Sequence, residues 1–164
     1  MPEANKPKVT IYTDGACSSN PGPGGYGIVL MFTKNDGSVV KKELSKGFKN
    51  TTNNRMELLA VIDALQSLKI PCCVDIYSDS KYVTDAINQK WLEGWVSKNW
   101  KLNTKNPAKN IDLWQKYLAI QKEHDIKFIW VKGHNDNEFN EKCDKLAVMA
   151  RSNTELEEDK GYES

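Results

Sequence analysis

The order of strand-like and helix-like segments constrains the fold of this chain more than any other feature. Three segments with a strand pattern come first, joined by short turn-rich loops: residues 8–14, 25–33 and 38–48. Residues 55–69, RMELLAVIDALQSLK, are apolar around most of a helical circumference, as expected of a helix lying on a sheet. A strand follows at 74–79, VDIYSD. This order, with a helix between strands after a meander, predicts an α/β protein with a mixed sheet and helices packed on its faces.

The remaining periodic segments continue the alternation. We expect one further strand, KFIWVK at 127–132, and helices at 80–87, 89–98, 110–124 and 140–151. Asn110 stands where a capping residue would begin the third of these helices, and His124 near its end would interact favourably with the helix dipole.

Length and composition fit one domain. The chain has 164 residues, 39% hydrophobic and 27% charged, enough to bury a core without a structural metal. No apolar run approaches the roughly 20 residues that span a bilayer, and the start, MPEANKPK, lacks the apolar core of a signal peptide. The four cysteines show neither zinc-site spacing nor a disulfide framework. We therefore expect a cytoplasmic protein with reduced thiols and no membrane association.

Charge is distributed unevenly. The formal net charge is +1, but residues 153–164 hold five acids and one base and so carry −4, which leaves +5 for the rest. Residues 90–109 hold five lysines and one acid, with three tryptophans between them. Lysines interleaved with flat rings are typical of a surface that holds a nucleic-acid backbone, although a solvated helix with its tryptophans facing the core fits the segment equally well.

Four carboxylates occupy positions that suit chemistry. Asp14 ends the first strand, in IYTDGACSSNPGPGGYG, and Asp79 ends the strand at 74–79. Glu57 lies in the first turn of the long helix, and Asp144 lies on the last helix. Ligands of open sheets gather beyond the carboxyl ends of parallel strands. The sequence therefore favours a common site for the four.

Each carboxylate also has a structural alternative. Asp14 could start the turn of a hairpin, and Asp79 could cap the following helix. Glu57 could complete a capping box begun by Asn54, and Asp144 could pair with a surface base.

Carboxylates that share one site require protons or a cation to offset their repulsion. All-oxygen ligands select hard cations, so we expect Mg²⁺, with Mn²⁺ as the alternative. A pair of such ions roughly 4 Å apart can activate water and stabilise the leaving oxygen in phosphodiester hydrolysis.

Several motifs together resemble ribonuclease H of type 1, in order from about Lys8 to Arg151: YTDGACSSNPGPGGYG, TTNNRMELLAVIDAL, YSDSKYV, WKLNTKNPAKNIDLWQ and WVKGHNDNEFNEKCDKLA. The resemblance implies a five-stranded mixed sheet with the first three strands antiparallel, flanked by helices. It also implies endonucleolytic cleavage of the RNA strand of RNA–DNA hybrids by two-metal catalysis with little sequence specificity, leaving a 5′-phosphate and a 3′-hydroxyl.

The resemblance also implies roles for individual residues. Asp14, Glu57, Asp79 and Asp144 match the metal-binding and catalytic carboxylates, with Asp14 bridging both ions, and His134 matches a histidine that moves protons or releases product. The RNA strand would contact Cys17, Asn20, Asn53 and Glu57. The DNA strand would place a phosphate in a pocket formed by Thr52 and Asn54. It would continue along an apolar channel formed by Tyr82, Trp91 and Trp95. A basic protrusion would add salt-sensitive affinity through Lys98, Lys101, Lys105 and Lys109.

Some features depart from the family pattern. The loop after His134, NDNEFNE, is unusually acidic, and the tail at 153–164 has no counterpart in the core motifs and is expected to be disordered. We expect a flexible N-terminus at 1–7, a catalytic domain at 8–152, a monomer and no small-molecule cofactor. The alternatives are a non-catalytic nucleic-acid-binding module, or a nuclease or integrase that shares the fold.

Overall fold

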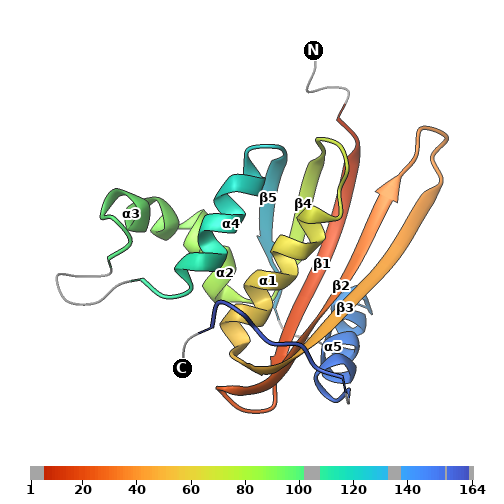
Figure 1. Ribbon diagram of the computed structural model, residues 1–164. Coiled ribbons are helices and arrows are strands. Elements are labelled where there is room, and N and C mark those ends of the chain that lie inside the picture. The colour runs from red at the N-terminus through yellow and green to blue at the C-terminus, as the bar shows by residue number, and fades with distance from the viewer. Residues whose placement is uncertain (1–5, 102–107, 133–137, 154, 163–164) are drawn as a thin grey trace.

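The computed structural model describes residues 6–101, 108–132, 138–153 and 155–162. Its centre is a five-stranded sheet of order β3-β2-β1-β4-β5 (Figure 1). The strands are β1 (Lys8–Cys17), β2 (Gly22–Thr33), β3 (Val39–Thr51), β4 (Cys73–Ser78) and β5 (Asp125–Trp130). β1, β2 and β3 pair antiparallel, whereas β4 pairs parallel with β1 and with β5. The predicted α/β class and mixed sheet are confirmed.

Helices cover both faces of this sheet. They are α1 (Asn53–Gln66), α2 (Lys81–Asn88), α3 (Trp91–Ser97), α4 (Ile111–Gln121) and α5 (Glu138–Arg151). α1 packs on β1 and β2 and against α4, whereas α5 packs on β1, β2 and β3. In Figure 1 α5 lies behind the sheet and α1 lies in front of it. The main core lies on the α1 side, and a small cluster of Tyr12, Val29 and Cys143 lies on the α5 side.

α1 begins at the cluster of capping residues that the sequence offers. Thr52 is the N-cap, with extended backbone, and its Oγ1 accepts a hydrogen bond from the Arg55 amide at 3.2 Å. Buried side chains surround the helix, because it lies between the sheet and α4. This agrees with the predicted helix that is apolar on most sides.

Two glycines allow helices to approach the sheet closely. A Cβ on Gly15 would lie 2.8 Å from the Glu57 amide nitrogen, so only glycine lets the first turns of α1 reach β1. A Cβ on Gly27 would collide with the Cys143 carbonyl of α5. Both close approaches set the positions of acidic residues, Glu57 on α1 and Asp144 on α5.

The C-terminal segment, residues 155–162, packs against the domain. Glu157 extends the sheet edge, because its amide donates to the Gly47 carbonyl at 3.0 Å and its carbonyl accepts from the Lys49 amide at 2.8 Å. Asp159 pairs with Arg55 at 2.7 Å, and the two side chains are 4% and 2% exposed. The structure therefore differs from the expected disorder, because an almost fully buried guanidinium requires carboxylate partners.

Among the described residues, no helix combines the length and apolar character needed to cross a bilayer.

Candidate active site

Asp14 and Asp79 are neighbours because of strand register. Thr13 of β1 and Ser78 of β4 form the last pair between these parallel strands. Asp14 directly follows Thr13, and Asp79 directly follows Ser78. Asp14 is 3% exposed. It pairs with Gly27 inside the continuing β1–β2 ladder, so it does not begin a turn.

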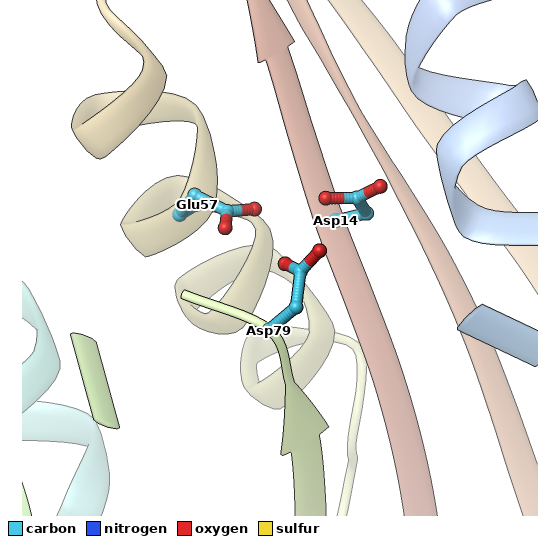
Figure 2. Close-up of side chains that lie close together, drawn as sticks. All are labelled: Asp14, Glu57 and Asp79. Carbon is cyan, nitrogen blue, oxygen red and sulfur yellow. The ribbon is translucent and has the colours of Figure 1, made fainter. Parts of the chain in front are cut away.

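Glu57 reaches the same place from α1. One carboxylate oxygen from each of Asp14, Glu57 and Asp79 lies within 4.8 Å of the others. Figure 2 shows the three side chains directed toward one another from β1, from α1 and from the end of β4. The capping-box alternative for Glu57 is wrong, because the N-cap is Thr52 and its third following residue is Arg55.

The structure also decides the alternatives for Asp79, which directly follows β4, and for Asp144 on α5. The N-cap of α2 is Ser80, whose Oγ accepts from the Val83 amide at 3.3 Å, so Asp79 does not cap the helix. Asp144 lines one cavity of about 350 Å³ together with Asp14, Glu57 and Asp79. We call this cavity the carboxylate pocket. The four acids that the sequence singled out therefore converge.

Burial makes Asp14 and Glu57 hard to ionise. Burial first, and then the charges of Asp79 and Asp144, raise the pKa of Asp14 to about 9. The pKa of Glu57 is raised well above its ordinary value by burial, with Asp14 and Asp79 adding to the effect. At neutral pH the site therefore retains protons unless a cation takes their place.

The donor set of the pocket fits a hard divalent cation. Its ligating side chains are carboxylates, and no histidine or cysteine is among its lining residues in the described part of the chain. Glu57 Oε1 is buried and has no hydrogen-bond partner among the described residues, so an acceptor is available inside the cluster. His134 lies outside the described residues, as does most of the acidic loop after it.

A second cavity, of about 740 Å³, lies beside the start of α1, and we call it the Arg55 pocket. It brings together four residues that the resemblance assigns to substrate binding: Asn20, Thr52, Asn54 and Lys109. Arg55, which the sequence did not single out, also lines it, together with Gly161 and Tyr162 of the C-terminal segment. Asn110, Asp112 and their neighbours complete the wall.

Hydrogen bonds fix the backbone between the two pockets. The Cys17 amide donates to Asn53 Oδ1 at 2.7 Å, and the Asn53 amide donates to Asn20 Oδ1 at 2.9 Å. These bonds tie the β1–β2 connection to the start of α1. Burial raises the pKa of the Cys17 thiol to about 11, so this thiol stays protonated. Three of the four predicted RNA contacts, Cys17, Asn20 and Asn53, are thus joined in one strip by hydrogen bonds.

The tryptophans of the basic segment at 90–109 divide between the two alternatives, because one is exposed and another packs against the core. Trp91, the first residue of α3, is 46% exposed, whereas the ring of Trp95 packs against Trp114 with centroids 5.9 Å apart. Lys98 and Lys101 lie in exposed positions near the end of α3, and Lys105 lies outside the described residues.

Tyr82 lines the carboxylate pocket and is held by its hydroxyl group. The hydroxyl oxygen accepts from Trp114 Nε1 at 2.9 Å and from Asn110 Nδ2 at 3.1 Å. Asn110 has a left-handed backbone with φ of 59° and makes no side-chain capping bond to α4. Asn110 therefore occupies the predicted N-cap position of α4, but its side chain bridges Tyr82 to the Arg55 guanidinium, whose Nη1 donates to Asn110 Oδ1 at 3.3 Å.

The sequence analysis also missed Lys81 and Trp130. Lys81 lines the carboxylate pocket, and its ammonium nitrogen lies 4.9 Å from the centroid of the Trp130 ring. Trp130 Nε1 donates to the backbone carbonyl of Asp79 at 3.1 Å. The lysine is adjacent to the YSDS sequence that contains Asp79, so its position after that aspartate was the available signal.

Comparisons with known proteins identify relatives of the whole chain. A family model described as RNase H matches residues 6–152. The ribonuclease H of Trichodesmium erythraeum (strain IMS101) is 51% identical over 156 residues, which are 95% of this chain and 96% of that protein. The crystal structure of LC9-RNase H1, described as a type 1 RNase H with the type 2 active-site motif, is 30% identical, with a TM-score of 0.81 over 90% of this chain and 73% of that one. The structure of LC11-RNase H1 in complex with an RNA/DNA hybrid, 24% identical with a TM-score of 0.64 over 88% and 96% of the chains, shares the fold.

Proposed function

The chain belongs to the ribonuclease H family of metal-dependent nucleases, and from that premise we propose that it hydrolyses the RNA strand of RNA–DNA hybrids in its carboxylate pocket. The products would be a 5′-phosphate and a 3′-hydroxyl. The observation that carries the proposal is the convergence of Asp14, Glu57, Asp79 and Asp144 on one cavity.

The four carboxylates have the properties that a metal-dependent nuclease needs. We propose that they would hold two Mg²⁺ ions, or Mn²⁺ in their place. Bound divalent ions lower the pKa of an attacking water and stabilise the charge of the leaving oxygen. Asp14 lies on β1, Glu57 on α1 and Asp144 on α5, and Asp79 directly follows β4, so packed elements support all four ligands. His134 would carry a proton to or from the reacting groups.

The two neighbouring pockets suggest how a hybrid would bind. We propose that the strip of Cys17, Asn20 and Asn53 contacts the RNA strand, where the 2′-hydroxyl distinguishes RNA from DNA. A phosphate of the DNA strand would then enter the Arg55 pocket beside Thr52 and Asn54. The structure of LC11-RNase H1, which shares the fold, contains an RNA/DNA hybrid, and we propose that this chain binds the same class of substrate. Contacts to sugars and phosphates carry little base information, so sequence preference would be weak.

The region around α3 would extend the contact along the DNA strand. Tyr82 and the rings of Trp91 and Trp95 would form its apolar side. Lysines would neutralise phosphates and give salt-dependent affinity, namely Lys98, Lys101, Lys105 and Lys109.

We further propose that residues 8–152 form the catalytic domain, that the protein acts as a monomer in the cytoplasm, and that it needs no small-molecule cofactor. The C-terminal segment would belong to the folded unit, because Asp159 is buried against Arg55.

The test compares substrates at equal concentration. A labelled RNA strand is offered paired with DNA, paired with RNA and single-stranded, and the product ends are identified by phosphatase and ligase treatment. We expect cutting of the hybrid alone, with 5′-phosphate ends. Binding without cutting would favour a non-catalytic module, and cutting only at DNA ends would favour an integrase.

A matched pair of variants tests the contact region. Trp91→Ala combined with Lys101→Ala should weaken hybrid binding and flatten its salt dependence more than it slows the chemical step. Lys69→Ala is the control, because Lys69 is exposed and lies beyond the C-terminal end of α1, at the opposite end of that helix from Asn53 and Asn54. Unchanged affinity in the double variant would mean that α3 has a structural role only.

A further inference from the structure

One positive charge faces the carboxylate pocket. Among its lining residues in the described chain, Lys81 is the only one with a cationic side chain. The residue is exposed and begins α2, two positions after Asp79. It forms no ion pair with an acidic side chain of the described residues, so its ammonium is free to receive an anion from solution.

The neighbouring tryptophan holds this ammonium in place. Lys81 Nζ lies 4.9 Å from the centroid of the Trp130 ring, within the range of a cation–π interaction. Trp130 ends β5, opposite Ser78 of β4, and its Nε1 donates to the Asp79 carbonyl at 3.1 Å. The ring is 41% exposed, so core packing does not account for its position. Asp79, the indole and the ammonium therefore form one connected unit at the rim of the pocket.

An unneutralised rim would oppose the substrate. A nucleic-acid strand carries a negative charge every roughly 3.4 Å along its axis, so phosphates on either side of the cleaved one also approach the acidic cluster. Cations bound among the carboxylates would offset the charge of the cleaved phosphate. A fixed ammonium at the rim would do the same for its neighbour.

We propose that Lys81 binds the phosphate adjacent to the cleaved one on the RNA strand, and that Trp130 is the positioning residue that holds its ammonium there. This inference rests on the proposed function of the carboxylate pocket. Because the contact forms in the bound substrate as well as in the transition state, its loss falls on KM more than on kcat.

The first experiment measures binding without cleavage. Hybrid affinity is titrated against salt with the full chain carrying Asp14→Asn, alone and together with Lys81→Gln, Lys81→Arg or Lys69→Gln. Removing one phosphate contact should lower the slope of log affinity against log salt by about one. Lys81→Arg and the Lys69→Gln control should keep the parent slope. An unchanged slope in the Lys81→Gln protein overturns the proposal.

The second experiment measures steady-state cleavage of the hybrid in the otherwise native chain. Lys81→Gln should raise KM about fivefold and affect kcat less. Trp130→Leu should raise KM about twofold and keep the salt slope, since the Lys81 ammonium remains but is no longer held in position by the indole ring. Equal losses in Lys81→Gln and Lys81→Arg would assign the residue a packing role and refute the proposal.

Two further outcomes separate the failure modes. If the native chain does not cut hybrids, the proposed function fails, whereas the salt titration still reports on the lysine. If Lys81→Gln tightens the binding of Mg²⁺ alone and leaves hybrid affinity unchanged, then the ammonium acts on the cations and the assignment to a phosphate is wrong.

Discussion

Removal of the Asp159 carboxylate should destabilise the domain strongly, although this residue lies only five positions before the last in the chain. Its two oxygens accept from Arg55 Nε at 2.7 Å and from a terminal guanidinium nitrogen at 3.0 Å, and also from Thr51 Oγ1 at 2.7 Å. Loss of one partner of a buried ion pair costs about 3–5 kcal/mol. Arg55 keeps two bonds to Asp112, at 2.9 and 2.7 Å, so we expect the lower end of that range for Asp159→Asn.

A loss of about 3 kcal/mol corresponds to a fall in Tm of about 6–12 °C in a domain of this size. Urea unfolding should show the same free-energy loss as a lower midpoint with an unchanged m-value. Glu158→Gln is the matched control, because it removes an exposed charge from the same segment. That change should stay within about 0.5 kcal/mol of the parent.

A double-mutant cycle with Arg55→Met tests the cause. If the buried pair is responsible, the double variant should lose less than the sum of the single variants, with a coupling of about 2 kcal/mol. Additive losses, or an Asp159→Asn protein as stable as the Glu158→Gln control, would refute the reasoning.

Three further predictions concern the carboxylate pocket. Glu57→Gln should raise the Tm of the metal-free protein at pH 7 by about 4 °C in scanning calorimetry with chelator. The reason is that the raised pKa of Glu57 favours folding below its ordinary value of 4.5, and this contribution is lost as pH rises. An unchanged Tm would contradict the burial argument. Mg²⁺ affinity measured by calorimetric titration should increase up to about pH 9, since the cation displaces the proton that the raised pKa of Asp14 retains, and pH-independent affinity would speak against it. Gly15→Ala should lose about 1–3 kcal/mol of unfolding free energy in urea and more than about tenfold in cleavage rate. Its Cβ would lie 2.8 Å from the Glu57 amide nitrogen and from Met56 Cβ, whereas Gly94→Ala, with nothing within 4 Å, is the control for an added methyl group. Equal behaviour of the two variants would contradict a tight approach of α1 to β1.

The periodicity of the sequence predicted the succession of strands along the chain and the long helix, because their apolar patterns are local. The predicted end of the first strand, Asp14, was too early. β1 continues to Cys17, since the glycine-rich stretch that resembles a loop begins β2 at Gly22 and pairs with it. Glycines give no local strand signal, and their presence is explained by close approaches in the fold, of α5 to Gly25 and Gly27 and of Cys17 and Thr51 to Gly24.

Glu57 and Asp79 lie near the ends of periodic elements, which local patterns reveal, whereas Asp14 lies inside β1 and Asp144 inside α5, and the family motifs identify these two. The residues around the four carboxylates could not be found from the sequence. Arg55 and Asp159 are 104 positions apart, and Trp130 and Asp79 are 51 apart, so no local pattern connects them. His124 shows the same limit, because its Nδ1 accepts from the Cys72 amide at 3.0 Å, a contact 52 positions away that helix-dipole reasoning does not predict.

The most direct test of the central claim is the single-turnover rate of hybrid cleavage as Mg²⁺ is titrated, for the native chain and for Asp14→Asn. The carboxylate pocket predicts a rate that saturates with Mg²⁺ and disappears with chelator, and a loss of at least roughly a thousandfold in Asp14→Asn. Hybrid binding by that variant should stay close to that of the native chain. Cleavage by Asp14→Asn at the native rate, or cleavage in the presence of chelator, would contradict the assignment of these carboxylates as the metal site.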